Sequence, residues 1–336
     1  MAQLSNTYEI ADAKGLREEL ANTINRISPE EVPLTSLIGT QSVKSIHPEW
    51  QLDTLATPDT ANNRPEGNDW TYDAVTATSR VGNYTQISDK SFIVSGSLEQ
   101  ADKAGRASEI AYQTAKKGLE LKIDREVTLL SNQASSAGSG NGATNRTLGG
   151  LRAWLATNDS LGSGGSSGGF NTSTNVVDAA TNGTQRAFTK ALMDEAILST
   201  YNAGGSPSVL MVSPYVKTVF SNLLDAADIV PSQKNLTGNA PTTLIGAADA
   251  YMSDFGLINV VVNRQMARAG AGTARNAFLL DPSTIKLGVF RDIMMEQPAK
   301  TGDAEKRVLL TEYTLLVKNE AANGVVADLY GVSASA

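Results

Sequence analysis

Histidine is the side chain that most often serves as a general base in enzymes, and this chain of 336 residues contains one, His47. Pro48 follows it in a strand-like stretch, and the nearest acidic residue is Glu49. A Ser-His-Asp triad would have to use His47, but nothing around it suggests the geometry of a general base. We interpret His47 as incidental to catalysis and predict no catalytic residue.

Three short stretches match catalytic or phosphate-binding motifs without the context that gives those motifs meaning. Residues 164–168 (GGSSG) match the hydrolase elbow, but they lie in low-complexity sequence rather than between a strand and a helix. Residues 283–286 (STIK) match S-x-x-K at an expected strand start. The glycine-rich residues 138–142 follow a helix and lack the G-K-[ST] of a phosphate loop. We therefore predict that the protein is not an enzyme.

The composition narrows the choice of ligands and partners. The chain has no cysteine, which excludes disulfides and thiolate metal sites, and no Asp/Asn ladder has the spacing of a calcium loop. We predict no metal and no cofactor. The net charge is −7 and basic residues are not clustered, so tight nucleic-acid binding is disfavoured and DNA is expected only by proximity. No apolar run approaches a membrane span and no signal peptide is predicted.

The most distinctive predicted element is a long helix from Ser97 to Gln133. Ser97 and Gln100 fit a capping box, and no proline interrupts the stretch. At about 1.5 Å per residue the helix would span roughly 54 Å, enough to cross a whole domain. Struts of this length suit proteins that must reach their neighbours.

The faces of this helix carry two expectations. Apolar positions should pack on the protein's own sheet, namely Ile110, Leu119, Ile123, Val127 and Leu130. The pairs Lys116–Glu120 and Lys122–Glu126 are spaced for ion pairing on an exposed surface, where each contributes a few tenths of a kcal/mol. A contact with a neighbouring subunit is the alternative role for these charges.

Before the helix, residues 45–95 are predicted to form a long two-stranded excursion. One side runs from Ser45 to Leu55 and the other from Ala77 to Val94, with a polar tip at residues 58–69. Such a pair cannot bury itself, so its aromatic residues should need a partner surface. The inter-subunit contact residues predicted here are Trp50, Glu66, Trp70, Tyr72, Tyr84 and Phe92.

The remaining segments give a coarse order of elements. Residues 1–44 resemble an arm, in which Leu16, Leu20, Ile24 and Ile27 share one helical face. Residues 134–186 are rich in Gly and Ser and are expected to be flexible, apart from an apolar island at 148–155 that should dock. Residues 187–230 predict a helix-strand-helix unit, and residues 255–336 are mostly strands.

This order of arm, hairpin, long helix, helix-strand-helix unit and strand-rich return resembles the major capsid proteins of tailed bacteriophages, with the Hong Kong 97 type fold. Local segments strengthen the resemblance, including Ile27-Ser28-Pro29, residues 47–53 (HPEWQLD), Glu66-Gly67 and residues 83–87 (NYTQI). The resemblance implies an α+β fold with an N-terminal arm at 1–44 and an extended loop at 45–95. It also implies a peripheral domain at 96–189 with a spine helix at 97–134, an axial domain at 190–280, and a return to the peripheral domain at 281–336.

The implied function is structural. The chain would assemble with itself as hexamers and pentamers into the icosahedral head of the virion, in the host cytoplasm. Scaffold, portal and decoration proteins would be further partners, with no membrane involved. Two alternatives stay open: another virion part such as a tail or fibre subunit, and a carbohydrate-active enzyme with paired carboxylates.

Overall fold

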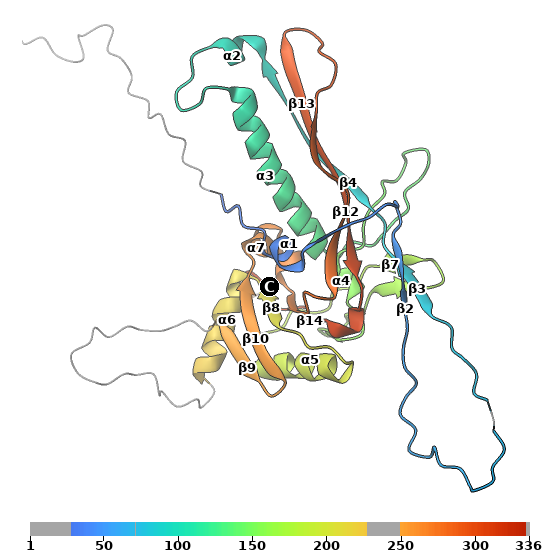
Figure 1. The fold of residues 1–336 in the computed structure, drawn as a ribbon. Coiled ribbons are helices and arrows are strands. Elements are labelled where there is room, and N and C mark those ends of the chain that lie inside the picture. The colour runs from blue at the N-terminus through green and yellow to red at the C-terminus, as the bar shows by residue number, and fades with distance from the viewer. Residues whose placement is uncertain (1–27, 71, 227–248, 334–336) are drawn as a thin grey trace, which may run out of the picture.

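The computed structural model describes residues 28–70, 72–226 and 249–333. They form an α+β protein with two larger sheets, a long helix beside one of them, and a loop that projects away from the body (Figure 1). The predicted arm helix at 14–27 and the segment 227–248 of the predicted axial domain lie outside the described residues.

The first sheet has four strands in the order β1-β12-β13-β4. Its strands are β1 Thr40–Ser42, β12 Ile285–Glu296, β13 Ala304–Val317 and β4 Gln86–Ser95. The helix α3 (Glu109–Leu130) packs along β4 and β13. Lys90 of β4 forms an ion pair with Asp124 of α3 at 2.6 Å, and this contact raises the pKa of the Lys90 ammonium.

The prediction of one unbroken helix from Ser97 to Gln133 is wrong. The structure has a short helix α2 (Gly96–Gln100), a break at residues 101–108, and then α3. Gly105 in the break has φ +78°, a left-handed conformation that glycine adopts without strain. The N-cap of α2 is Ser95 rather than Ser97, because the Ser95 hydroxyl accepts the Leu98 N–H. At about 1.5 Å per residue α3 spans roughly 33 Å.

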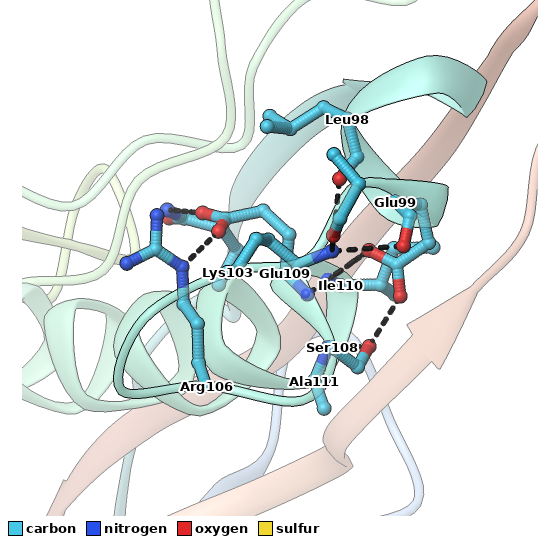
Figure 2. A network of polar contacts seen from close by, with 10 residues as sticks. Leu98, Glu99, Lys103, Arg106, Ser108, Glu109, Ile110 and Ala111 are labelled. Carbon is cyan, nitrogen blue, oxygen red and sulfur yellow. Dashed lines mark hydrogen bonds and ion pairs between the residues drawn. The ribbon is translucent and has the colours of Figure 1, made fainter. Parts of the chain in front are cut away.

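Side chains satisfy both helix ends at this break (Figure 2). The Glu99 carboxylate accepts the Ser108 hydroxyl at 2.6 Å and the backbone N–H groups of Glu109 and Ile110 at 2.9 and 3.3 Å. Lys103 Nζ donates to the carbonyls of Leu98 and Glu99, both at 2.8 Å. Negative charge at a helix start and positive charge at a helix end both favour the helix dipole. The break is therefore a stable corner.

The buried face of α3 also differs from the expected one. Leu121, Arg125 and Leu129 are buried at helical spacing, whereas Ile123 and Val127 are half exposed. Leu130 alone of the five predicted core positions is fully buried. Since α3 lies against β4 on one side and against α1 and α7 on others, its orientation follows several contacts rather than one apolar stripe.

The second sheet has six strands in the order β5-β14-β11-β8-β10-β9. Its strands are β5 Asp159–Ser160, β14 Gly324–Val326, β11 Ala277–Leu280, β8 Val209–Val212, β10 Gly256–Val262 and β9 Ala250–Ser253. Central strands β8 and β11 are buried throughout, as expected of strands covered on both faces. Phe278 and Leu280 enter one core cluster and Ala277 and Leu279 the other, following the two-residue period of a strand.

The predicted helix-strand-helix unit is confirmed within the described residues. Helix α5 (Lys190–Asn202) begins after Thr189, whose hydroxyl accepts the Leu192 N–H at 3.4 Å. Strand β8 follows, and Ser213 then caps α6 (Pro214–Ala226) by accepting the Val216 N–H. Both helices pack on the second core cluster.

The expectation that residues 134–186 are flexible is wrong. The segment holds α4 (Leu151–Trp154), β5, and the paired strands β6 (Gly169–Asn171) and β7 (Val176–Asp178). The apolar island docks as predicted: Leu148, Leu151 and Leu155 are fully buried. Gly162 lies so close to Thr184 that a Cβ there would come to 2.1 Å of its carbonyl oxygen. Some of these glycines therefore allow close packing instead of flexibility.

The predicted long hairpin is only partly correct. Strand β2 (Glu49–Leu52) pairs with β3 (Ser79–Gly82), and these four-residue strands form the base of the excursion. The second predicted side continues beyond β3, but its residues from Gln86 onward form β4 and pair with β13. Pairing with β13 gives β4 a ten-residue ladder, which β2 is too short to offer.

A buried carboxylate joins the N-terminal part of the chain to the rest. Glu126 of α3 is fully buried and accepts the backbone N–H of Leu34 at 2.6 Å and that of Thr35 at 2.9 Å. These N–H groups belong to the first turn of α1 (Pro33–Ile38), whose N-cap residue Val32 offers no side-chain cap. Glu126 also accepts the Thr35 hydroxyl and the side-chain amide of Asn263, which caps α7 (Arg264–Arg268).

The expected Lys122–Glu126 and Lys116–Glu120 surface pairs are not the ones the structure shows. Glu126 is buried in the contacts just described, and Glu120 pairs with Lys117 at 2.7 Å. The short helix α8 (Ala271–Ala274) and the turn η1 (Glu320–Ala322) complete the described elements.

Candidate functional site: an exposed loop and its base

The loop between β2 and β3 leaves the body at a tightly packed base. Gly82 of β3 lies opposite Glu49 of β2, and a Cβ at Gly82 would come to 2.9 Å of the side chains of both His47 and Glu49. The His47 ring stacks on Tyr84, with ring centroids 4.1 Å apart. Glycine at position 82 thus leaves the space that the imidazole ring occupies.

His47 serves this packing and not a catalytic triad. Its Nδ1 lies 3.5 Å from Glu49 Oε1, and its buried Nε2 has no hydrogen-bond partner among the described residues. Burial lowers the pKa of the imidazole, with Arg80 adding to this effect and Glu49 opposing it. The ring is therefore neutral near pH 7 and stabilises the loop base through its aromatic face.

A second set of aromatic rings fixes the base to the core. Trp50 of β2 stacks on Trp154 of α4 with centroids 5.6 Å apart, and Trp154 stacks on Phe170 of β6 at 5.9 Å. Trp50 packs against the first core cluster. The formerly puzzling Gly/Ser-rich segment thus supplies the surface on which the loop base rests.

Beyond this base, every described residue of the segment 53–78 is exposed. Large apolar side chains are included: Leu55 is 98% exposed, Trp70 82%, Tyr72 94% and Val75 97%. Figure 1 shows the segment running out from β2 and back to β3 without touching the body. Exposed apolar area on this scale marks an interaction surface.

The six residues predicted to contact a neighbour fall into two groups. Glu66, Trp70 and Tyr72 lie on the exposed loop. Trp50, Tyr84 and Phe92 do not, since Trp50 and Tyr84 stack within their own subunit and Phe92 is half-buried on β4, opposite Arg307 of β13. The premise that these three aromatics lack a core of their own is wrong, because β4 belongs to the four-stranded sheet.

Sequence reasoning missed two further groups of exposed apolar side chains. One lies on β4, α2 and β12 at the end of the first sheet: Ile87, Ile93, Leu98, Met294 and Met295. The other lies on α5, β9, β10 and the turn between these strands: Leu198, Tyr201, Met252, Phe255 and Leu257. The alternation of β4 offered one signal, because Ile87 and Ile93 occupy the face opposite Phe92 and Val94.

The described residues offer little of what an enzyme or a membrane protein needs. No group of three or more His, Cys, Asp or Glu side chains that could hold a metal ion occurs among them. Within the same ranges, no helix is long and apolar enough to cross a bilayer.

Comparisons with known proteins agree with this geometry. Residues 3–330 match the family described as SU10 major capsid protein. The major capsid protein of Escherichia phage Phieco32 is 28% identical over 353 residues, covering 95% of this chain and 96% of that protein.

Solved phage structures share the fold at low sequence identity. The capsid asymmetric unit of cyanophage A-1(L) matches with a TM-score of 0.63 and 14% identity, covering 94% of this chain and 97% of that one. A structure of the major capsid and decoration proteins of phage G matches with a TM-score of 0.52 and 12% identity, covering 97% and 99%. A loop built to contact something outside its own subunit, a fold shared with phage capsids and a family match over residues 3–330 together show that this chain belongs to the SU10 major capsid protein family and is a structural subunit of a phage capsid, not an enzyme.

Proposed function

We propose that this subunit assembles as hexamers and pentamers into an icosahedral head, and that the loop at 53–78 lies over an adjacent subunit. The observation that carries the proposal is the exposure of this loop, with Trp70 and Tyr72 more than four-fifths uncovered. Aromatic side chains are the commonest anchors of protein interfaces. Around a closed ring, each loop finds the same acceptor surface on the next copy.

The reach of the loop supports a contact in trans. The segment from residue 53 to residue 78 leaves and returns at the same base, so about half of it spans outward. At about 3.3 Å per extended residue this gives a reach of roughly 40 Å. A contact that far from the base is beyond the subunit's own core and within the range of a neighbour.

The domain roles follow the two sheets. We assign the peripheral part to α3 with the sheet β1-β12-β13-β4, and the axial part to the six-stranded sheet with α5 and α6. This assignment modifies the boundaries expected from sequence, since β5 and β14 join the axial sheet from outside 190–280. Residues 1–44 remain the proposed arm and 281–336 the main return to the peripheral part.

Further partners follow from assembly in the host cytoplasm. Scaffold, portal and decoration proteins would contact the shell, and the phage G structure contains decoration proteins beside its capsid subunits. Packaged DNA would adjoin the shell by proximity, since a net charge of −7 gives little attraction for phosphate.

The test is the double variant Trp70→Ser with Tyr72→Ser. Both side chains are almost fully exposed, so circular dichroism and the melting temperature of the free subunit should not change. Shell formation, followed by sedimentation velocity and electron microscopy, should be lost. The matched control is Asn62→Ser, which alters the same loop without removing an aromatic ring and should assemble normally. Full-sized shells from the double variant would contradict the proposed loop contact.

A further inference from the structure

A groove open to solvent runs between α3, β4 and α7. It has a volume of about 570 Å³, and its lining includes Ile123 and Val127 of α3, Gln265 and Arg268 of α7, and Ala269. Ile123 and Val127 are the half-exposed apolar residues that the buried face of α3 leaves out. This subunit therefore presents an apolar strip on its main helix that its own described residues do not cover.

The N-terminal part of the chain passes along the rim of this groove. The Gln265 side-chain amide donates to the carbonyls of Pro29 and Glu31 at 3.2 and 3.0 Å, and Arg268 donates to the Pro29 carbonyl at 3.4 Å. Both donors also line the groove. The chain preceding Pro29 therefore starts within a residue or two of the groove wall.

The sequence immediately before this anchor has a suitable pattern. Between residues 14 and 27, Leu16, Leu20, Ile24 and Ile27 recur at the spacing of one helical face. A face of this kind needs an apolar surface to cover it. Attachment at Pro29 gives the segment a high effective concentration at the groove, so even a modest affinity would keep it there.

We propose that residues 14–27 of the same chain seat their apolar face in the α3–α7 groove, against Ile123 and Val127. This contact would hold the arm of each subunit along its own spine helix, next to the point where Glu126 already holds α1. The proposal is independent of how the loop at 53–78 contacts a neighbour.

The absence of cysteine allows a direct test in the full chain. Ile24→Cys would be combined with Ile123→Cys or with Val127→Cys, so that the only disulfide available joins the arm to the groove. On mild oxidation of free subunits, we expect an intramolecular bridge in at least one of these pairs. The control pairs use Asn25→Cys, about 100° around the helix, and should form the bridge much more slowly.

Mixing the single-cysteine proteins separates the same chain from a neighbour. If Ile24→Cys and Val127→Cys proteins form covalent dimers as readily as the double variant bridges internally, the occupant is another copy and the proposal fails. Equal bridging by Ile24→Cys and Asn25→Cys pairs would show that no defined face is seated, and would also overturn it.

A second measurement avoids engineered cysteines in the groove. Trypsin cleavage after Arg17 reports how often the arm leaves its seat, because proteolysis follows the population of the open form. We expect cleavage to be about tenfold faster in Ile24→Ser than in the unaltered protein, and unchanged in Asn25→Ser. Equal rates in all three proteins would refute the seating. Shell formation is scored separately, so this result stands apart from the test of the proposed function.

Discussion

Glu126 is the residue whose replacement should most clearly separate the N-terminal part of the chain from the body. Its carboxylate is fully buried and accepts hydrogen bonds from Leu34, Thr35 and Asn263. Glu126→Ala leaves these donors without an acceptor, in a space that the shorter side chain does not fill. The start of α1 then has no cap, since Val32 supplies none.

The size of the effect follows from the donors that stay buried. The Leu34 N–H and the Asn263 amide bonds are both buried, and each unsatisfied donor costs about 1–3 kcal/mol. Together they predict a loss of about 2–6 kcal/mol in the free energy of unfolding. Glu126→Gln keeps one acceptor oxygen and turns the other into a donor facing the Thr35 N–H. It should cost less, about 1–3 kcal/mol.

The assay is urea unfolding of the free subunit, followed by circular dichroism. The matched control is Asp124→Ala on the same helix, which removes a partly exposed ion pair with Lys90 and should cost about 1 kcal/mol or less. Limited proteolysis should also find new cleavage within α1 in Glu126→Ala. If Glu126→Ala unfolds at the same urea concentration as Asp124→Ala, the reasoning about buried donors is refuted.

Two further predictions concern glycine packing and helix capping. Gly150→Ala places a Cβ 2.1 Å from the Ser131 carbonyl oxygen, so it should lower the melting temperature through a loss of about 1–3 kcal/mol, whereas alanine at the uncrowded Gly140 should not. The Ser108 hydroxyl, and then the N–H groups at the start of α3, lower the pKa of Glu99 below its usual 4.5, so its stabilisation is present above that pH and is lost as the pH falls through the folded pKa. Glu99→Gln should therefore flatten the loss of stability between about pH 5 and pH 3, and an unchanged acid profile in this variant would contradict the capping role.

Local sequence determined the elements whose start and end signals lie within a few residues. Thr189 before α5 and Ser213-Pro214 before α6 are caps that act on the next turn, and both are where the pattern predicted them. The short apolar run of β8 and the docking island at 148–155 were likewise readable, because a run of apolar residues has to be buried somewhere. The order of the elements was enough to suggest the capsid fold.

Other features depended on partners that are distant in the chain. The break before α3 is stable because Glu99 and Lys103 reach across it, and such a corner cannot be told from a continuous helix by periodicity alone. Residues 134–186 look flexible by composition, yet Arg146 reaches the Thr85 carbonyl at 2.7 Å and forms an ion pair with the buried carboxylate of Glu312. Composition reports the local cost of ordering such a segment, and not the contacts that offset it.

The sequence by itself therefore determined that this chain is a structural protein with an exposed, aromatic loop, since Trp70 and Tyr72 sit in a polar stretch with no apolar company. Only the tertiary structure decided which aromatics are free. Trp50 and Tyr84 looked equally exposed, but they stack on Trp154 and His47, while β4 pairs with β13 at a separation of more than two hundred residues. Glu126 gives the same lesson, because its spacing from Lys122 suggests a surface pair and the packing of α1 against α3 makes it a buried cap. Burial is a property of the assembled chain, and no local pattern contains it.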